Sequence, residues 1–313
     1  MSVRILSVSD GESGLRLDRW FRRHFPEFPH GRLEKLLRSG QIRVDSARVR
    51  ASTRLQAGQC VRVPPLGDWL TKPPTRLAVD PHDAQALIES VLHRDDDILV
   101  INKPPGLAVQ GGSRVSRHLD GMLDALRFDA PERPRLVHRL DKDTSGALVL
   151  AGNANSAAHL AAAFRCRAVR KFYWALVVGN PPAPFGAIDI PLAKKSGRFG
   201  EQVVTGKGQD ARTRYAVVGR AGRQASWLLL ELVTGRTHQL RAHLAAIGTP
   251  IQGDGKYGGR AAFLTAREVA PRLHLHAREV HLEGPDGHFL RVKAPLPDHM
   301  AATWAFFGFD PNL

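Results

Sequence analysis

A proline-rich stretch near residue 70 sets the main constraint on how this 313-residue chain folds. Five prolines lie between positions 64 and 81, and no apolar periodicity is visible over residues 66–91. Because closely spaced prolines favour extended chain over helix or central strand, we predict an extended linker over 66–91. The chain then divides into two domains, residues 1–65 and 92–313, and its length is sufficient for two separate cores.

The first domain is predicted to contain two short helices followed by short strands. Apolar residues recur at helical spacing over residues 15–24 and 30–38, and two prolines separate these segments. Gly40 stands where a C-terminal helix cap is expected. Short strands are predicted near residues 42–44 and 59–63.

Positive charge is concentrated in this first domain. Residues 1–65 hold 13 of the 45 lysines and arginines and 6 of the 30 acidic residues, which is +7 of the net +15. Arg32, Lys35 and Arg38 recur every three residues along the second predicted helix and form a basic stripe. A surplus of this size indicates a polyanionic partner, because neutralised phosphates release condensed counterions. Nucleic acid fits better than a membrane surface, since no basic amphipathic segment stands out.

The cysteines and the N-terminus indicate a reduced, cytoplasmic protein. Cys60 and Cys166 are the only cysteines, and their spacing matches neither a disulfide framework nor a zinc site. The N-terminal residues lack the apolar run of a signal peptide. No stretch approaches the 18 or more apolar residues of a membrane span.

The second domain, residues 92–313, mixes strand-like runs with a few helices and shows no internal repeat. Because regular alternation of strand and helix is missing, we predict an α+β sheet rather than a Rossmann fold.

A polar turn between two apolar runs presents a carboxylate in this second domain. Residues 136–150 read Leu-Val-His-Arg-Leu-Asp-Lys-Asp-Thr-Ser-Gly-Ala-Leu-Val-Leu, which predicts strand, turn and strand, with Gly146 providing turn freedom. Asp141 on that turn, close to Arg139, is a candidate nucleophile or general base. The alternative is a turn aspartate that only accepts main-chain hydrogen bonds.

Three further segments bring polar or aromatic groups to the ends of predicted elements. An apolar strand over 97–103 ends at Lys103, where a surface lysine is the plain alternative. Tyr173 lies in an aromatic and β-branched strand, where a core position is the plain alternative. A helix is expected to begin near Thr237, a suitable N-cap, and to project Arg241 toward a cleft, because the apolar positions of that helix face elsewhere.

The complete His-Arg-Leu-Asp-x-x-Thr-Ser-Gly block from His138 to Gly146 resembles the signature of the RluA-type pseudouridine synthases. Later Gly-Arg-Thr-His-Gln-Leu-Arg and Gly-Asp-Gly-Lys-Tyr-Gly blocks continue the likeness. The resemblance implies an isomerase that converts uridine in RNA to pseudouridine. It implies Asp141 as the catalytic carboxylate, Tyr173 as the active-site tyrosine and Arg241 as the arginine that pairs with the aspartate.

The resemblance also implies a fold and a set of RNA contacts. A pseudouridine-synthase domain would have an extended mixed, mostly antiparallel sheet flanked by helices, with a central cleft. Segments 16–21 and 39–45 are similar to the S4 RNA-binding domain, so residues 1–65 are predicted to be an S4-like unit. Arg139 would wedge into the space left by a flipped uridine, since extrusion costs a few kcal/mol. The other predicted RNA contacts are Lys103 and the stripe of Arg32, Lys35 and Arg38.

The chemistry implied by the resemblance needs no cofactor, and we predict none. Two histidine pairs, His238 with His243 and His274 with His276, lack the Cys, Asp or Glu spacing of a zinc site, so no metal is predicted either.

The expected substrate is 23S ribosomal RNA, since the S4-like unit and the stretch 109–113 are similar to family members that modify that RNA. Two alternatives stay open: the same chemistry on tRNA, and a non-catalytic RNA-binding factor for ribosome assembly. A factor of that kind should lack the aspartate, the tyrosine or the arginine. We expect a monomer that does not bind membranes.

Overall fold

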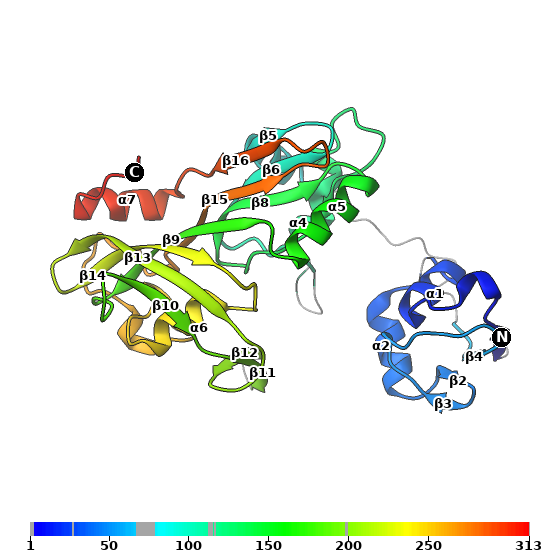
Figure 1. The fold of residues 1–313 in the computed structure, drawn as a ribbon. Coiled ribbons are helices and arrows are strands. Elements are labelled where there is room, and N and C mark those ends of the chain that lie inside the picture. The colour runs from blue at the N-terminus through cyan, green and yellow to red at the C-terminus, as the bar shows by residue number, and fades with distance from the viewer. Residues whose placement is uncertain are drawn as a thin grey trace. The chain divides into compact units, whose positions relative to one another are not determined.

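The structure is a computed structural model that describes residues 3–26, 28–66, 79–111, 115, 117–197 and 200–312. The chain forms two compact units, Met1–Leu77 and Ala78–Leu313 (Figure 1). Residues 67–78 of the predicted linker lie outside the described residues, and so do Gly112 and Ser113 of the stretch 109–113. No helix in the described ranges is long and apolar enough to cross a membrane.

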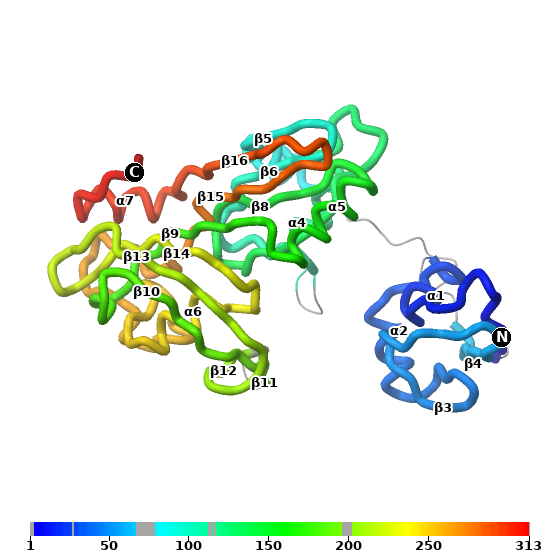
Figure 2. The backbone as a smooth tube through the Cα atoms, viewed as in Figure 1, coloured from blue at the N-terminus to red at the C-terminus, as the bar shows by residue number. Residues whose placement is uncertain are grey.

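The first unit joins two helices to an antiparallel sheet with the strand order β1-β4-β2-β3 (Figure 2). Trp20 and Phe21 of the first helix and Leu33 and Leu37 of the second are buried in one core. Gly40 has a φ of 71° just after the second helix, as a C-terminal cap requires. Both helices lie within two residues of their predicted bounds. The elements are β1 (Arg4–Ser7), η1 (Asp10–Glu12), α1 (Leu17–His24), α2 (His30–Arg38), β2 (Arg43–Val44), β3 (Ala47–Arg48) and β4 (Cys60–Val63).

The second unit is built on a ten-stranded mixed sheet with the main order β10-β13-β14-β9-β15-β8-β6-β5, while β16 pairs with β15 and β7 with β8. Its only parallel pairing among the described strands joins β15 to β8. The predicted α+β, mostly antiparallel sheet is therefore confirmed. The strands are β5 (Val91–Arg94), β6 (Ile98–Lys103), β7 (Arg135–Leu136), β8 (Ser145–Ala151), β9 (Arg170–Val178), β10 (Phe185–Asp189), β13 (Arg212–Ala221), β14 (Ala225–Leu232), β15 (Leu275–Glu283) and β16 (Phe289–Lys293).

Helices and one separate hairpin complete this unit. Leu160 of α5 is buried against the sheet beside β8 and β15, and Trp304 of α7 stacks in a cluster with Trp174 and Trp227. The hairpin consists of β11 (Leu192–Gly197) and β12 (Gly200–Thr205). The helices are α3 (Pro81–Glu89), α4 (Leu119–Met122), η3 (Leu123–Leu126), α5 (Ala154–Arg165), α6 (Gln239–Ala246), η4 (Gly259–Ala262) and α7 (Asp298–Phe307).

Helix α3 corrects the prediction of an extended linker that reaches residue 91. Pro81 occupies the first helical turn, where its missing N–H breaks no helical hydrogen bond. Asp80 caps this helix by accepting a hydrogen bond from the main-chain nitrogen of His82 at 2.8 Å. The last proline of the stretch therefore starts a helix instead of extending the linker, and residue 91 already belongs to β5.

Ala277 of β15 stands at the junction of the two halves of the sheet. It pairs with Gly146 of β8 on one side and with Tyr173 of β9 on the other. The backbones come so close that a Cβ added to Gly146 would lie 2.2 Å from the Ala277 carbonyl oxygen. Gly146 also has a φ of 109°, which side chains rarely adopt. The glycine is required by this close approach as well as by the turn.

Replacing this glycine should weaken the junction. We expect Gly146→Ala to lower the free energy of unfolding of the second unit by about 2–4 kcal/mol, from backbone strain and steric overlap together. Gly222→Ala is the matched control, since Gly222 also has a positive φ, of 59°, and has open space around it. Urea unfolding of both variants measures the difference. An equal loss of stability in the two would contradict the close approach.

Candidate active site

The predicted strand-turn-strand over residues 136–150 is confirmed, because β7 pairs antiparallel with β8 and the polar turn joins them. The main-chain nitrogen of Thr144 donates to the carbonyl oxygen of Asp141 at 3.2 Å and closes the turn. His138 secures its other end: its Nε2 accepts a hydrogen bond from the main-chain nitrogen of Val149 at 2.8 Å, and its ring stacks on Phe164. Burial lowers the pKa of His138 to about 3, so the ring stays neutral and can accept that bond.

Lys103 is fully buried, which contradicts its predicted contact with RNA. Its Nζ donates to the carbonyl oxygens of Pro104, Leu107 and Lys142 at 2.8, 2.9 and 3.0 Å. Strand β6 runs alongside β8, so its last residue points under the turn that carries Asp141 rather than into solvent. Burial lowers the pKa of Lys103 to about 7, and the nearby carboxylates of Asp143 and Asp141 oppose that shift. Lys103 therefore links the loop that follows β6 to the turn that carries Asp141 through hydrogen bonds.

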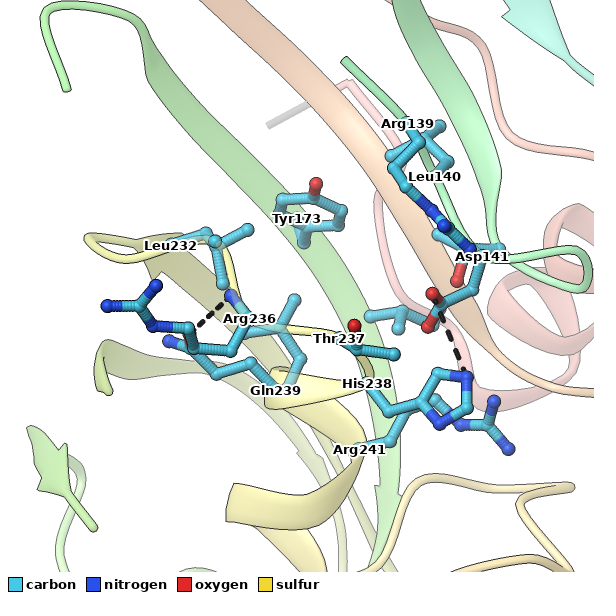
Figure 3. Close-up of a pocket in the computed structure, with 14 residues that line it drawn as sticks. Arg139, Leu140, Asp141, Tyr173, Leu232, Arg236, Thr237, His238, Gln239 and Arg241 are labelled. Carbon is cyan, nitrogen blue, oxygen red and sulfur yellow. Dashed lines mark hydrogen bonds and ion pairs between the residues drawn. The ribbon is translucent and has the colours of Figure 1, made fainter. Parts of the chain in front are cut away.

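A pocket opens beside the Asp141 turn (Figure 3). Its walls come from that turn, from β9, from the end of β14, and from the loop and first turn of α6. Asp141 is the only carboxylate among the described residues that line it. The lining residues are Arg139, Leu140, Asp141, Thr144, Tyr173, Leu232, Gly235, Arg236, Thr237, His238, Gln239, Leu240, Arg241 and Leu275.

Tyr173 lies across the pocket from Asp141 and is 5% exposed (Figure 3). Burial, and then the negative charge of Asp141, raises the pKa of the Tyr173 phenol. The side chain that lines the pocket is therefore a neutral phenol at physiological pH, with little tendency to act as a base.

Arg241 lines the pocket as predicted, but its ion pair is made with Asp254 rather than with Asp141. Its Nε and Nη2 reach the two oxygens of Asp254 at 2.8 and 2.6 Å, and Asp254 is 1% exposed. A bidentate pair of this kind fixes the guanidinium plane. The predicted direct pairing is therefore wrong in this structure, because a buried carboxylate holds the arginine first. Burial acts to lower the pKa of the Arg241 guanidinium, but the bond to Asp254 and, to a smaller extent, the charge of Asp141 raise that pKa above its usual value.

The start of α6 also differs from the prediction. The helix begins at Gln239, and the N-cap is His238 with a φ of 52°, not Thr237. The turn is instead held by the buried amide of Gln239, whose oxygen accepts from the Thr234 hydroxyl at 2.7 Å and from the main-chain nitrogen of Arg236 at 3.1 Å. This turn directs the His238 ring to Asp141, with 3.9 Å between Nε2 and Oδ1.

Of the residues predicted to contact RNA, all are exposed except Lys103. Arg139 lies at the pocket and makes no hydrogen bond or ion pair with any residue that the structure describes. Arg32, Lys35 and Arg38 are exposed on α2 of the first unit.

Gln239, Asp254 and Tyr257 are not among the candidates from the sequence, and His238 is considered there only as half of a histidine pair that does not fit a zinc site. All four lie in the two blocks that continue the family resemblance, which was the only signal that could have found them. The histidines of the two pairs have ordinary hydrogen-bond partners. His243 contacts Thr213 and a carbonyl oxygen, and His274 and His276 each contact one hydroxyl and one carbonyl oxygen. No cluster of three potential metal ligands occurs in the described ranges.

Comparison with known proteins identifies the family. Residues 97–246 match the family model described as RNA pseudouridylate synthase. Curated relatives are 33% to 36% identical over 95% of this chain. The chain belongs to the RNA pseudouridylate synthase family.

The curated relatives carry a more specific name than the family model. Ribosomal large subunit pseudouridine synthase C of Vibrio vulnificus (strain CMCP6) is 33% identical over 95% of this chain and 94% of its own length. The protein of the same name from Escherichia coli (strain K12) is 35% identical, with the same coverage. Among solved structures, human RNA Pseudouridylate Synthase Domain Containing 4 superposes with a TM-score of 0.60 and 29% identity, over 72% of this chain and 96% of that one.

The buried lysine can be tested by its effect on stability. Lys103→Met keeps most of the unbranched side chain but leaves three carbonyl oxygens without a donor, so we expect a loss of about 2–5 kcal/mol in the free energy of unfolding. Lys142→Met, at an exposed position on the same turn, should cost little.

The pH dependence gives a second readout for the same variant. Between pH 7 and 10.5 the unfolded chain binds a proton at this lysine that the folded chain has released, so folding becomes more favourable as the pH rises. The stability difference between the parent protein and Lys103→Met should therefore grow from pH 7 to pH 9 in urea unfolding. A constant difference would contradict the burial of the ammonium group.

Proposed function

We propose that this protein isomerises specific uridines of 23S ribosomal RNA to pseudouridine, with Asp141 as the catalytic carboxylate. The single observation that carries the proposal is the position of Asp141: it is the one carboxylate on the described pocket lining, and it faces Tyr173. The named function of the relatives and their coverage of 95% of this chain support ribosomal RNA as the substrate. Transfer RNA remains the alternative substrate.

The reaction breaks the N1–C1′ bond of uridine, turns the uracil, joins C5 to C1′, releases the C5 proton and protonates N1, so the product is an isomer of uridine. Asp141 would start it, either by attacking C1′ or by removing a proton from the sugar in a glycal route. A pocket with one carboxylate suits this chemistry. Ordinary glycosidases pair an acid with a nucleophile or base to direct water to the sugar.

Tyr173 and Arg241 would assist the carboxylate. Tyr173 lines the pocket, and its ring would stack on the uracil. Burial keeps its phenol neutral, because it disfavours the ionised form. Arg241 would contribute a fixed positive charge near Asp141. Because its ion pair with Asp254 holds it in place, that charge needs no reorganisation during the reaction.

Arg139 would stabilise the RNA while the uridine is flipped into the pocket. Its side chain is exposed at the pocket, beside the carboxylate, and has no protein partner to give up in the described chain. A guanidinium is well suited to fill the space that the base leaves, because it can stack on neighbouring bases and pair with phosphate.

The first unit would act as an S4-like RNA-binding domain, and the protein would work as a cytoplasmic monomer without cofactor or metal. Two helices beside a small sheet, with the exposed Arg32, Lys35 and Arg38 on α2, support this proposal. The +7 net charge of residues 1–65 would then attract RNA through its phosphates.

Removal of the carboxylate tests the catalytic proposal. RNA labelled with tritium at uridine C5 should release the label with the parent protein. Asp141→Asn should reduce the release rate by roughly three orders of magnitude or more while RNA binding is largely retained. The matched control is Asp143→Asn, an exposed carboxylate two residues further along the same turn, which should keep its activity. Equal rates for the two variants would contradict the assignment.

The basic stripe is tested by the salt dependence of RNA binding. Replacing Arg32, Lys35 and Arg38 with Gln should weaken binding and reduce the slope of log K against log salt by roughly 0.7–0.9 for each phosphate that is no longer neutralised. Arg220→Gln with Arg223→Gln is the control, because these exposed residues lie at the opposite end of β14 from the pocket residue Leu232. An unchanged slope in the stripe variant would refute the role of α2.

A further inference from the structure

His238 adopts a backbone conformation that needs an explanation. Its φ of 52° lies in the left-handed region, and its side chain makes no capping hydrogen bond to α6. Such a conformation costs on the order of 1–3 kcal/mol outside glycine, although histidine tolerates it better than most residues. In this structure it turns the imidazole into the pocket, toward the Asp141 carboxylate (Figure 3).

The opposite side of the ring is held by Tyr257. The Tyr257 hydroxyl lies 2.7 Å from His238 Nδ1, and it also accepts a hydrogen bond from the main-chain nitrogen of Val203 at 3.2 Å. With an N–H already bound to its oxygen, the phenol is free to donate its own proton to Nδ1. Nδ1 is then the acceptor, and the ring proton sits on Nε2, the atom that faces Asp141. The other tautomer would direct a nitrogen lone pair at a carboxylate.

Burial, more than the surrounding charges, keeps the His238 ring neutral near physiological pH. Burial is the largest influence and lowers the pKa of His238. The positive charges of Arg241 and Lys256 act in the same direction, while Asp141 and Asp254 oppose them. Burial also raises the pKa of the Tyr257 phenol, so the hydroxyl keeps the proton that it donates.

We propose that His238 is a positioning residue for Asp141, held in its Nε2–H tautomer by Tyr257. This inference rests on the proposed catalytic role of Asp141. The 3.9 Å contact would shorten to a hydrogen bond when a uridine fills the pocket, since catalytic hydrogen bonds are often longer without substrate. A neutral donor orients the carboxylate and leaves its negative charge available, whereas an imidazolium would neutralise it.

The same chain of contacts ties Asp141 to the β11–β12 hairpin. Val203 belongs to β12, so the hairpin backbone fixes the Tyr257 hydroxyl, the hydroxyl fixes the ring proton of His238, and the ring proton faces the carboxylate. A hairpin displaced by RNA would therefore change the orientation of Asp141 through two hydrogen bonds.

The test compares His238→Leu with His238→Gln under single-turnover conditions, with tritium release from C5-labelled RNA as the readout. Leucine removes the donor and should slow the reaction roughly 10- to 100-fold, the size of effect expected from losing a hydrogen bond to a charged group, without changing RNA affinity. Glutamine places an amide N–H near the position of Nε2 and should restore most of the rate. Tyr257→Phe should give an intermediate decrease, because the tautomer is no longer fixed.

The pH profile separates positioning from a merely structural role. Because burial lowers the pKa of His238, the parent rate should fall on acidification only below the ordinary pKa of histidine, as the ring becomes a cation. This fall should shift to still lower pH in His238→Gln, whose side chain cannot be protonated. Parent-like rates in His238→Leu and Tyr257→Phe, or an identical acid limb in His238→Gln, would overturn the inference.

The failure of this inference is distinct from failure of the proposed function. If Asp141→Asn is inactive while His238→Leu is as fast as the parent protein, only the positioning role is refuted. If Asp141→Asn is active, the proposed function itself is refuted. Should His238→Leu fold poorly, Tyr257→Phe still tests the chain of contacts from its other end.

Discussion

The close approach of β8 and β15 at Gly146 and Ala277 is the constraint on which the site depends. Ala277 pairs with β8 on one side and with β9 on the other, so it fixes the spacing between the strand that follows Asp141 and the strand that carries Tyr173. No side chain fits between Gly146 and the Ala277 carbonyl. One missing Cβ therefore allows the carboxylate and the aromatic ring to share a pocket.

The turn that carries Asp141 is fixed from several directions before any substrate arrives. His138 binds it to β8, and the Lys103 ammonium joins its carbonyl oxygen at Lys142 to the turn after β6. His238 approaches the carboxylate from α6. The free-energy cost of ordering this turn is therefore met during folding and not during the reaction. A preorganised carboxylate of this kind favours the transition state over the ground state.

The sequence was sufficient for local structure and for the residues that a single motif contains. Helices α1 and α2, the strand-turn-strand around Asp141 and the α+β sheet follow from periodicity and turn chemistry. The roles of Lys103 and Arg241 could not be predicted, because each depends on which polar groups the fold brings into contact with the side chain. Lys103 was expected to be exposed at a strand end, but its Nζ is buried among carbonyl oxygens of the following loop and of the Asp141 turn. The family resemblance implied that Arg241 pairs with Asp141, yet Asp254, 13 residues further along the chain than Arg241, holds it. Helix α3 was also not predicted from the sequence, because Pro81 can start a helix as readily as it can end one.

The account is tested most directly by mapping pseudouridines in the 23S ribosomal RNA of a strain that lacks this protein, with carbodiimide treatment and primer extension. We predict that specific pseudouridines are missing, that the parent protein restores them, and that Asp141→Asn expressed at the same level does not. A complete set of pseudouridines in the deletion strain would contradict the ribosomal RNA target. Restoration by Asp141→Asn would contradict the central role of that carboxylate.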